Sequence, residues 1–200
     1  MIRLLLATRN AHKTREFTEM LGEVCTLLDM SVHPEIGEVV EDGATFAENA
    51  QLKAVIVSRQ VAGLVLADDS GLEVDSLGGA PGIFSARYSG PGATDATNRQ
   101  KLLAELARLA PGASRAARFR CVLVLARAGE VVGSFEGAVE GQIFEGECGS
   151  AGFGYDPLFQ PDGFDRSFAQ LTAIEKNQLS HRAMAVRELR DFLKSSPPSS

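Results

Sequence analysis

The chain has 200 residues, of which 44% are apolar, so it is long enough to bury one sizeable hydrophobic core. Its formal net charge of −6 argues against binding to nucleic acid or to anionic membranes, and any grip on a phosphate must be local. The apolar segment after Met1 is too short for a signal peptide or a membrane span. Three widely spaced cysteines without a CxxC pair are typical of reduced thiols in a cytosolic protein.

The N-terminal residues predict a strand that runs into a helix. Residues 2–8 are mostly apolar, and the apolar spacing after them predicts a helix that ends near Gly22. Thr8, Asn10 and Lys13 lie at the junction, where free backbone amides and the helix dipole favour an anion. The alternative is that Thr8 or Asn10 only caps the helix, but capping does not account for a lysine in the first turn.

Residues 24–28 can form a short second strand, and an acidic connection follows, which contains Glu35, Glu38, Glu41 and Asp42. Such a connection is most often only a solvated loop. The capping box from Thr45 to Glu48 then predicts a helix over residues 46–62. Asn49 and Lys53 lie off its apolar stripe, so a solvated Lys53 is the default interpretation.

The stretch from Leu64 to Gly71 predicts a buried strand that ends at Asp68 and Asp69. Adjacent residues of a strand point to opposite faces, so both carboxylates can face one ligand only if the strand has ended there. A loop rich in glycine and proline then carries Arg87 towards the same neighbourhood. A strand followed by an ordinary Asp-Ser-Gly turn is an equally good interpretation of these residues alone.

The middle of the chain predicts a helix followed by a hairpin. Thr94 is the expected cap of a helix that ends at Pro111, and residues 117–128 are expected to pair with residues 131–139 across a turn. The glycine-rich stretch at residues 149–157 is expected to be a loop. Its two aromatic side chains suit the stacking of a base, and a packed turn is the alternative.

The C-terminal region opens with a capping box, Thr172 to Glu175, and continues as a helix. Strands and helices alternate first and an antiparallel pair follows, so the expected fold class is α/β with a mixed sheet. No internal repeat or linker is visible. We expect a single domain over residues 1–194 and a disordered tail at residues 195–200.

Six motifs in the chain resemble, in the same order, those of the inosine triphosphate pyrophosphatase family. Any one of them is weak, whereas six in order are specific. They are Ala7–Lys13, Thr45–Ala54, Ala67–Asp75, Gly79–Tyr88, Phe153–Pro157 and Glu175–Arg182. Arg9 and His12 stand where many members carry glycine, which makes the expected phosphate loop more crowded.

The resemblance implies an elongated two-lobed fold with a central cleft, a homodimer and a cytoplasmic enzyme that does not bind nucleic acid or membranes. It implies hydrolysis of non-standard purine nucleoside triphosphates (ITP, dITP and XTP) to the monophosphate and pyrophosphate. That reaction cleanses the nucleotide pool and keeps deaminated purines out of DNA and RNA. The resemblance also implies Mg²⁺, which suits hard oxygen ligands and needs few protein carboxylates.

The resemblance assigns roles to individual side chains. Asp69 is expected to bind the metal and to activate water, assisted by Asp68. Glu41 is the expected second metal ligand, with Glu38 as its alternative. Phosphates and sugar are expected at Thr8, Asn10, Lys13, Lys53 and Lys176, with further substrate contacts from Arg9, Ala11, His12 and Ser70. The purine pocket is expected from Phe153, Gly154, Tyr155, Asp156, His181 and Arg182.

Two other functions are compatible with parts of this pattern. Maf-like nucleotide pyrophosphatases act on modified pyrimidines, but they lack the Ser-His-Arg ending found at residues 180–182. A nucleotide sensor without catalytic activity would bind tightly without turnover, and the intact set of carboxylates does not favour it.

Overall fold

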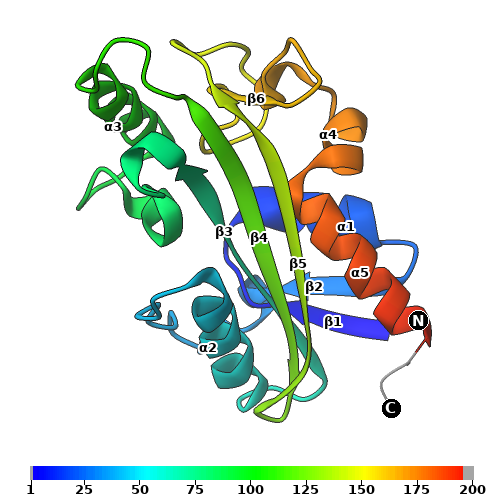
Figure 1. Ribbon diagram of the computed structural model, residues 1–200. Coiled ribbons are helices and arrows are strands. Elements are labelled where there is room, and N and C mark those ends of the chain that lie inside the picture. The colour runs from blue at the N-terminus through cyan, green and yellow to red at the C-terminus, as the bar shows by residue number, and fades with distance from the viewer. Residues whose placement is uncertain (1, 196–200) are drawn as a thin grey trace. The chain divides into compact units, whose positions relative to one another are not determined.

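The computed structural model describes residues 2–195 and contains a mixed six-stranded sheet with the strand order β2-β1-β3-β4-β5-β6 (Figure 1). This confirms the expected α/β class. The described residues divide into two compact units, of which the first comprises residues 2–69, 121–137 and 182–195, and the second residues 70–120 and 138–181. The boundary falls between Asp69 and Ser70 within one strand.

In the first unit, β1 (Ile2–Leu6) pairs in parallel with β2 (Cys25–Asp29) and with the start of β3 (Leu64–Val74). Leu4 and Leu6 pack into one apolar cluster with α1 (Ala11–Leu21) and α5 (His181–Ser195), whereas Leu5 packs into another with α2 (Phe46–Ser58). Successive side chains of β1 thus bury opposite faces, as expected for a parallel strand that is covered on both sides.

The second unit contains the other end of β3, α3 (Asp95–Ala107), β6 (Phe159–Pro161) and α4 (Ala173–Leu179). Two long strands contribute residues to both units, β4 (Ala116–Arg127) and β5 (Glu130–Ile143). Within the second unit, β5 and β6 are antiparallel, and the aromatic rings of Phe119, Phe159 and Phe168 pack together. The remaining elements are short 3₁₀ helices at Met30–Val32, Asp75–Leu77, Gly82–Arg87 and Phe168–Gln170.

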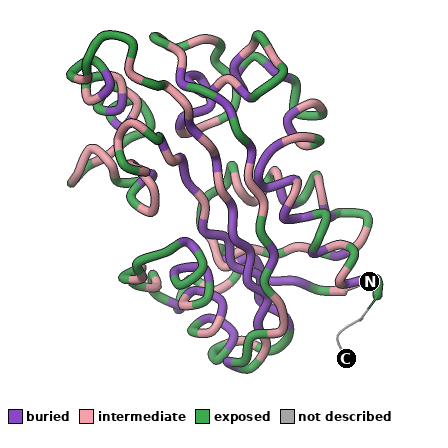
Figure 2. Tube along the Cα trace, in the orientation of Figure 1, coloured by how far each residue is buried: buried purple, intermediate pink, exposed green. Residues whose placement is uncertain are grey.

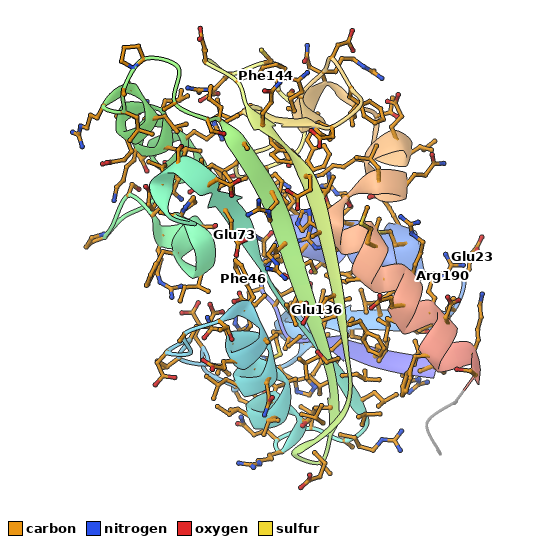
Figure 3. All side chains as sticks on the ribbon, in the orientation of Figure 1. Glu23, Phe46, Glu73, Glu136, Phe144 and Arg190 are labelled. Carbon is orange, nitrogen blue, oxygen red and sulfur yellow. The ribbon has the colours of Figure 1, made fainter. Side chains whose placement is uncertain are left out.

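Burial follows the strands, whose central residues are covered while the turns and outer helix faces are exposed (Figure 2). Some ion pairs lie at the surface, where water screens the charges. Arg190 of α5 and Glu23, which follows α1, are paired at 3.8 Å, but the Glu23 side chain is 91% exposed (Figure 3). All three cysteines are free, as the sequence predicts.

Several predicted boundaries are wrong. Helix α2 ends at Ser58 rather than at residue 62, because the amide of Gln60 bonds to the carbonyl of Val57 and Gly63, at φ +96°, turns the chain into β3. Strand β3 does not end at the two aspartates, since Leu72 and Val74 continue its buried pattern.

The hairpin and the C-terminal region also differ from the expectation. Strand β5 extends to Ile143, and the short strand β6 has no clear signal in the sequence. The C-terminal helix is interrupted, because Ser180 is extended (ψ 157°) and separates α4 from α5. Ser195, the first residue of the expected tail, belongs to α5, and the rest of that tail lies outside the described residues.

Candidate active site

Asp68 and Asp69 point to opposite faces of β3 because the strand continues through them. Asp68 is 3% exposed and accepts hydrogen bonds from Lys13, from Arg182 Nε at 3.1 Å and from Cys121 Sγ at 3.2 Å. Burial raises the pKa of Asp68, but the charges of Lys13 and Arg182 outweigh it and hold that pKa well below its usual value. Asp68 is therefore an ionised carboxylate engaged by internal partners.

Asp69 has a different environment. One oxygen, Oδ1, lies 3.2 Å from Lys53 Nζ, and the other, Oδ2, is buried without a hydrogen-bond partner among the described residues. Lys53 Nζ also donates to Glu41 Oε1 at 2.9 Å and to the carbonyl of Asp68 at 2.8 Å. Lys53 thus joins the carboxylates of Glu41 and Asp69 on this face of β3.

The prediction of a solvated Lys53 is wrong. The residue is 9% exposed and Asn49, one turn earlier on α2, is fully buried, so this polar face of the helix packs inward. A lysine is buried at this position because two carboxylates and one carbonyl satisfy its ammonium group. These partners precede Lys53 by 12 residues and follow it by 15 and 16, so no local pattern could indicate them.

The pKa of Asp69 is raised above its usual value. Burial is the main cause, Lys53 and Lys13 act against it, and the carboxylates of Glu41 and Asp68 reinforce it. A carboxylate whose proton affinity is raised in this way is better suited to accept a proton from water than an ordinary surface aspartate. The two neighbouring aspartates therefore differ in what they can do chemically.

The donor set around Lys53 fits Mg²⁺. Residues 2–195 contain no group of three or more His, Cys, Asp or Glu side chains suited to a metal. Mg²⁺ does not require one, because it keeps several waters and is usually held by one or two carboxylates together with substrate phosphates. The unpartnered Oδ2 of Asp69 and the neighbouring carboxylate of Glu41 meet that requirement.

We expect Glu41→Gln to lower hydrolysis severalfold and high Mg²⁺ to restore part of it, because the amide is a weaker ligand for a hard cation. Glu38→Gln should have little effect, since Glu38 is exposed whereas Glu41 contacts Lys53. Initial rates over a range of Mg²⁺ concentrations compare the two variants. If Glu38→Gln is the damaging substitution, Glu38 and not Glu41 holds the metal.

Arg182 is buried in an ion-pair network of the first unit. It is 2% exposed, and its Nη1 donates to Glu16 Oε2 at 2.6 Å while its Nε donates to Asp68. The expectation that Arg182 donates to a purine stays a prediction, and the structure adds a structural role beside it. Glu16 was not among the expected residues, although its position three residues after Lys13 on α1 places both on one helix face.

The start of α1 combines capping with the layout of an anion site. The side chain of Asn10 accepts from the amides of His12 and Lys13 at 2.9 and 3.2 Å, and Thr8 Oγ1 accepts from the amide of Asn10. Capping therefore explains Asn10, whereas Lys13 is held in the first turn by Asp68. Ala11 and His12 are exposed at this end of the helix.

Arg9 contacts a different segment of the first unit. Its guanidinium donates to the carbonyls of Met30 and Ile36 at 2.8 and 2.6 Å, and more weakly to that of His33 at 3.4 Å. These contacts fix the segment that leads into the acidic loop. A contact between Arg9 and substrate stays a prediction.

The second unit contains the loop Phe153–Asp156. Asp156 Oδ2 accepts from Lys176 Nζ at 2.6 Å and from the amide of Phe153 at 2.9 Å, and the Lys176 ammonium lies 5.0 Å from the Phe153 ring centroid. Lys176 is therefore buried against the loop rather than extended into solvent.

Tyr155 belongs to the core of this unit. It is 4% exposed, and its hydroxyl donates to the carbonyl of Ser85 at 2.9 Å. Tyr155 is therefore part of a packed turn and does not offer its ring for stacking on a base. Burial raises the pKa of Tyr155. His181 is also buried and stacks on Phe119, with ring centroids 4.8 Å apart.

The structure thus brings the expected residues together in two groups. In the first unit, Lys13 and Arg182 contact Asp68, and Lys53 contacts both Asp69 and Glu41. In the second unit, Lys176 contacts Asp156 and lies near the Phe153 ring. Ser70 is half-buried in β3, and Arg87 is exposed, with its guanidinium 5.3 Å from the Phe84 ring centroid. No described helix is long and apolar enough to cross a membrane.

The mixed sheet and the carboxylate–lysine groups define an α/β protein whose side chains suit a hard cation and a polyanion. Residues 4–192 match the Ham1 family, and the chain belongs to that family. This confirms the resemblance that the six motifs indicate.

Named relatives are similar to this protein over nearly the whole length of the chain. A dITP/XTP pyrophosphatase of Listeria innocua is 48% identical over 193 residues, which cover 94% of this chain and 93% of the relative. The Ham1 protein of Staphylococcus aureus is 38% identical with a TM-score of 0.85, covering 96% of this chain and 98% of that one. A HAM1 protein of Coxiella burnetii is 36% identical with a TM-score of 0.88, covering 98% and 100%.

Proposed function

We propose that the protein is a Mg²⁺-dependent nucleoside triphosphate pyrophosphatase that hydrolyses ITP, dITP and XTP to the monophosphate and pyrophosphate. Removing these deaminated purines from the nucleotide pool keeps them out of DNA and RNA. Support for the substrate class comes from relatives named dITP/XTP pyrophosphatase that match 93–96% of this chain. The observation that carries the chemistry is the buried oxygen of Asp69, which has no hydrogen-bond partner within residues 2–195 and lies beside Lys53 and Glu41.

The residues divide the work of the reaction. Asp69 takes a proton from the attacking water as that water adds across the anhydride between the α and β phosphates, and pyrophosphate leaves. Lys13 and Lys53 supply positive charge that a chain of net charge −6 must provide locally to hold a polyanion. Asp69 and Glu41 would hold Mg²⁺, which supplies further neutralisation of the phosphate charge when bound.

The second unit provides the expected contacts to the base. Phe153 offers an aromatic face, and the amide of Tyr155 can donate to the oxygen at the purine 6-position, whereas the amides of Phe153 and Gly154 already bond to Asp156 and Asp95. Adenine carries an amino group at that position, so a hydrogen-bond donor of the protein would meet a donor of the base and no hydrogen bond would form. A homodimer and a cytoplasmic location are part of the proposal and rest on the family resemblance.

We expect the purified protein to release pyrophosphate from ITP, dITP and XTP, with little release from ATP or the pyrimidine triphosphates. Chelation of divalent cations should stop the reaction because the phosphate charge is then no longer neutralised. A panel of NTPs and dNTPs with and without Mg²⁺, with product analysis by chromatography, tests this.

Three outcomes would contradict the proposal. Orthophosphate as the first product would refute the reaction class. A preference for modified pyrimidines would favour a Maf-like activity. Tight binding of ITP without turnover would indicate a sensor.

A further inference from the structure

The loop Phe153–Asp156 is held from outside by helix α3. The amide of Gly154 donates to Asp95 Oδ2 at 2.7 Å, and the carbonyl of Gly154 accepts from Arg99 Nη1 at 2.8 Å. Asp95 and Arg99 are four residues apart, so they lie on one face of α3. One acidic and one basic side chain thus bind both polar groups of a single residue.

Gly154 needs such partners because its surroundings lack regular structure. Its φ of +59° lies in the left-handed region, and it stands in a turn, outside the regular backbone hydrogen bonding of a helix or a strand. Other hydrogen bonds hold the residues on either side of Gly154, since the amide of Phe153 donates to Asp156 Oδ2 and the hydroxyl of Tyr155 donates to the carbonyl of Ser85. Charge-assisted bonds of the kind made by Asp95 and Arg99 are stronger than neutral ones.

Helix α3 is itself firmly anchored within the second unit. Its first turn is closed by a capping box between Thr94 and Thr97. Asn98, which is buried, accepts from the amide of Ser89 at 2.7 Å and donates to the carbonyl of Ser85 at 3.3 Å. The Ser85 carbonyl also accepts from the hydroxyl of Tyr155, so α3 and the loop share an anchor.

Arg99 is itself held in place. Its Nε donates to Glu147 Oε1 at 2.9 Å, and its side chain is only 15% exposed. The guanidinium is therefore fixed at both ends, by a carboxylate and by the carbonyl of Gly154. Because Glu147 already restricts the Arg99 side chain, bonding to the loop costs that side chain little further conformational entropy.

We propose that Asp95 and Arg99 are positioning residues that set the backbone of the Phe153–Asp156 loop and, through it, the selectivity for the purine base. This inference rests on the proposed function, which assigns the loop to base recognition. Neither side chain has to touch the nucleotide. Arg99 holds the Gly154 carbonyl, which shares one planar peptide unit with the Tyr155 amide, so the pair keeps that amide and the Phe153 ring in the orientation that accepts an oxygen at the purine 6-position.

The test compares variants in α3 and uses the product IMP as a probe that needs no chemistry. Asp95→Ala and Arg99→Ala each remove one of the two side chains that bond to the Gly154 backbone. Asp95→Asn keeps an acceptor for the Gly154 amide while removing the charge. Glu105→Ala and Arg108→Ala are matched controls, because they break an ion pair of 2.9 Å on the same helix away from the loop. IMP affinity, kcat and KM for ITP and ATP, and melting temperature are measured for all.

We expect the IMP dissociation constant and the KM for ITP to rise roughly fivefold in Asp95→Ala and in Arg99→Ala, the factor typical of one lost hydrogen bond. The kcat for ITP and the weak activity on ATP should change less than twofold, so the preference for ITP falls. Asp95→Asn should fall between the wild type and Asp95→Ala because it keeps a neutral acceptor, and both controls should resemble the wild type. The double variant should lose less than the product of the single losses, because both residues act on Gly154.

If IMP affinity and the ITP preference stay at wild-type values while the melting temperature falls, Asp95 and Arg99 have only a structural role and the inference is wrong. If the wild type binds IMP but does not hydrolyse ITP, the proposed function fails. Weaker IMP binding in the variants would then still support the positioning role of Asp95 and Arg99. If the wild type neither binds IMP nor hydrolyses ITP, both proposals fall.

Discussion

Replacing Asp69 by asparagine is expected to leave the protein folded and to lower kcat for ITP by about 10²–10⁴-fold, the range for loss of a general base. An amide neither accepts the proton of the attacking water nor balances the charge of Mg²⁺. The fold should survive because burial raises the pKa of Asp69, which means that the folded protein gains little from its charge. Lys53 also keeps its partner Glu41.

The measurement is kcat for ITP at saturating Mg²⁺, with the melting curve as the check on folding. Asp42→Asn is the matched control, because it makes the same chemical change at an exposed residue next to Glu41. Near-normal turnover in Asp69→Asn would remove Asp69 from the catalytic role. Equal losses in Asp69→Asn and Asp42→Asn would point to a general effect of net charge.

The same substitution at Asp68 should destabilise the fold, whereas Asp69→Asn should leave the protein folded. Asp68→Asn is expected to lower the free energy of unfolding by about 3–5 kcal/mol, the range for breaking a buried ion pair. It leaves Arg182 and Lys13 with less negative charge in the interior, although Glu16 still pairs with Arg182. For a chain of this length the melting temperature should fall by roughly 10 °C.

The pH dependence of stability provides a second readout for Asp68. Its pKa is lower in the folded state than in the unfolded chain, where an aspartate titrates at about 3.9. The stabilisation from Asp68 is therefore fully present above the unfolded pKa and is lost as the pH falls through the folded pKa. Below about pH 4, the difference in stability between wild type and Asp68→Asn should shrink.

Glu23→Gln is the control for Asp68→Asn, since it removes one partner of the exposed pair with Arg190 (Figure 3). A surface pair of this kind contributes little, so the melting temperature should hardly change. If Asp68→Asn melts like the wild type, the buried network does not stabilise the fold. A large loss in Glu23→Gln would show that surface charge dominates instead.

Local signals in the sequence predict most of the helices and strands. The capping residues Thr94 and Thr172 begin α3 and α4 as predicted, and Asn10 caps α1. These signals are reliable because a cap satisfies backbone amides only two or three residues away. Ends set by tertiary packing are less predictable, and β3 is the clearest case, because a strand can pass through two aspartates only where distant cations pair with them.

The sequence by itself determined the fold class, the family and the identity of the residues in the motifs, because these depend on residue order and short-range spacing. The tertiary structure decided how those residues are partnered. Arg182 meets Asp68 across 114 positions in the chain, and Lys53 meets Asp69 across 16. The two adjacent aspartates differ because Lys13 and Arg182 keep Asp68 ionised within a buried network, whereas burial raises the pKa of Asp69 and leaves one of its oxygens without a partner among the described residues. The physical reason is that burial and charge, which set a carboxylate's chemistry, come from neighbours in space rather than in sequence.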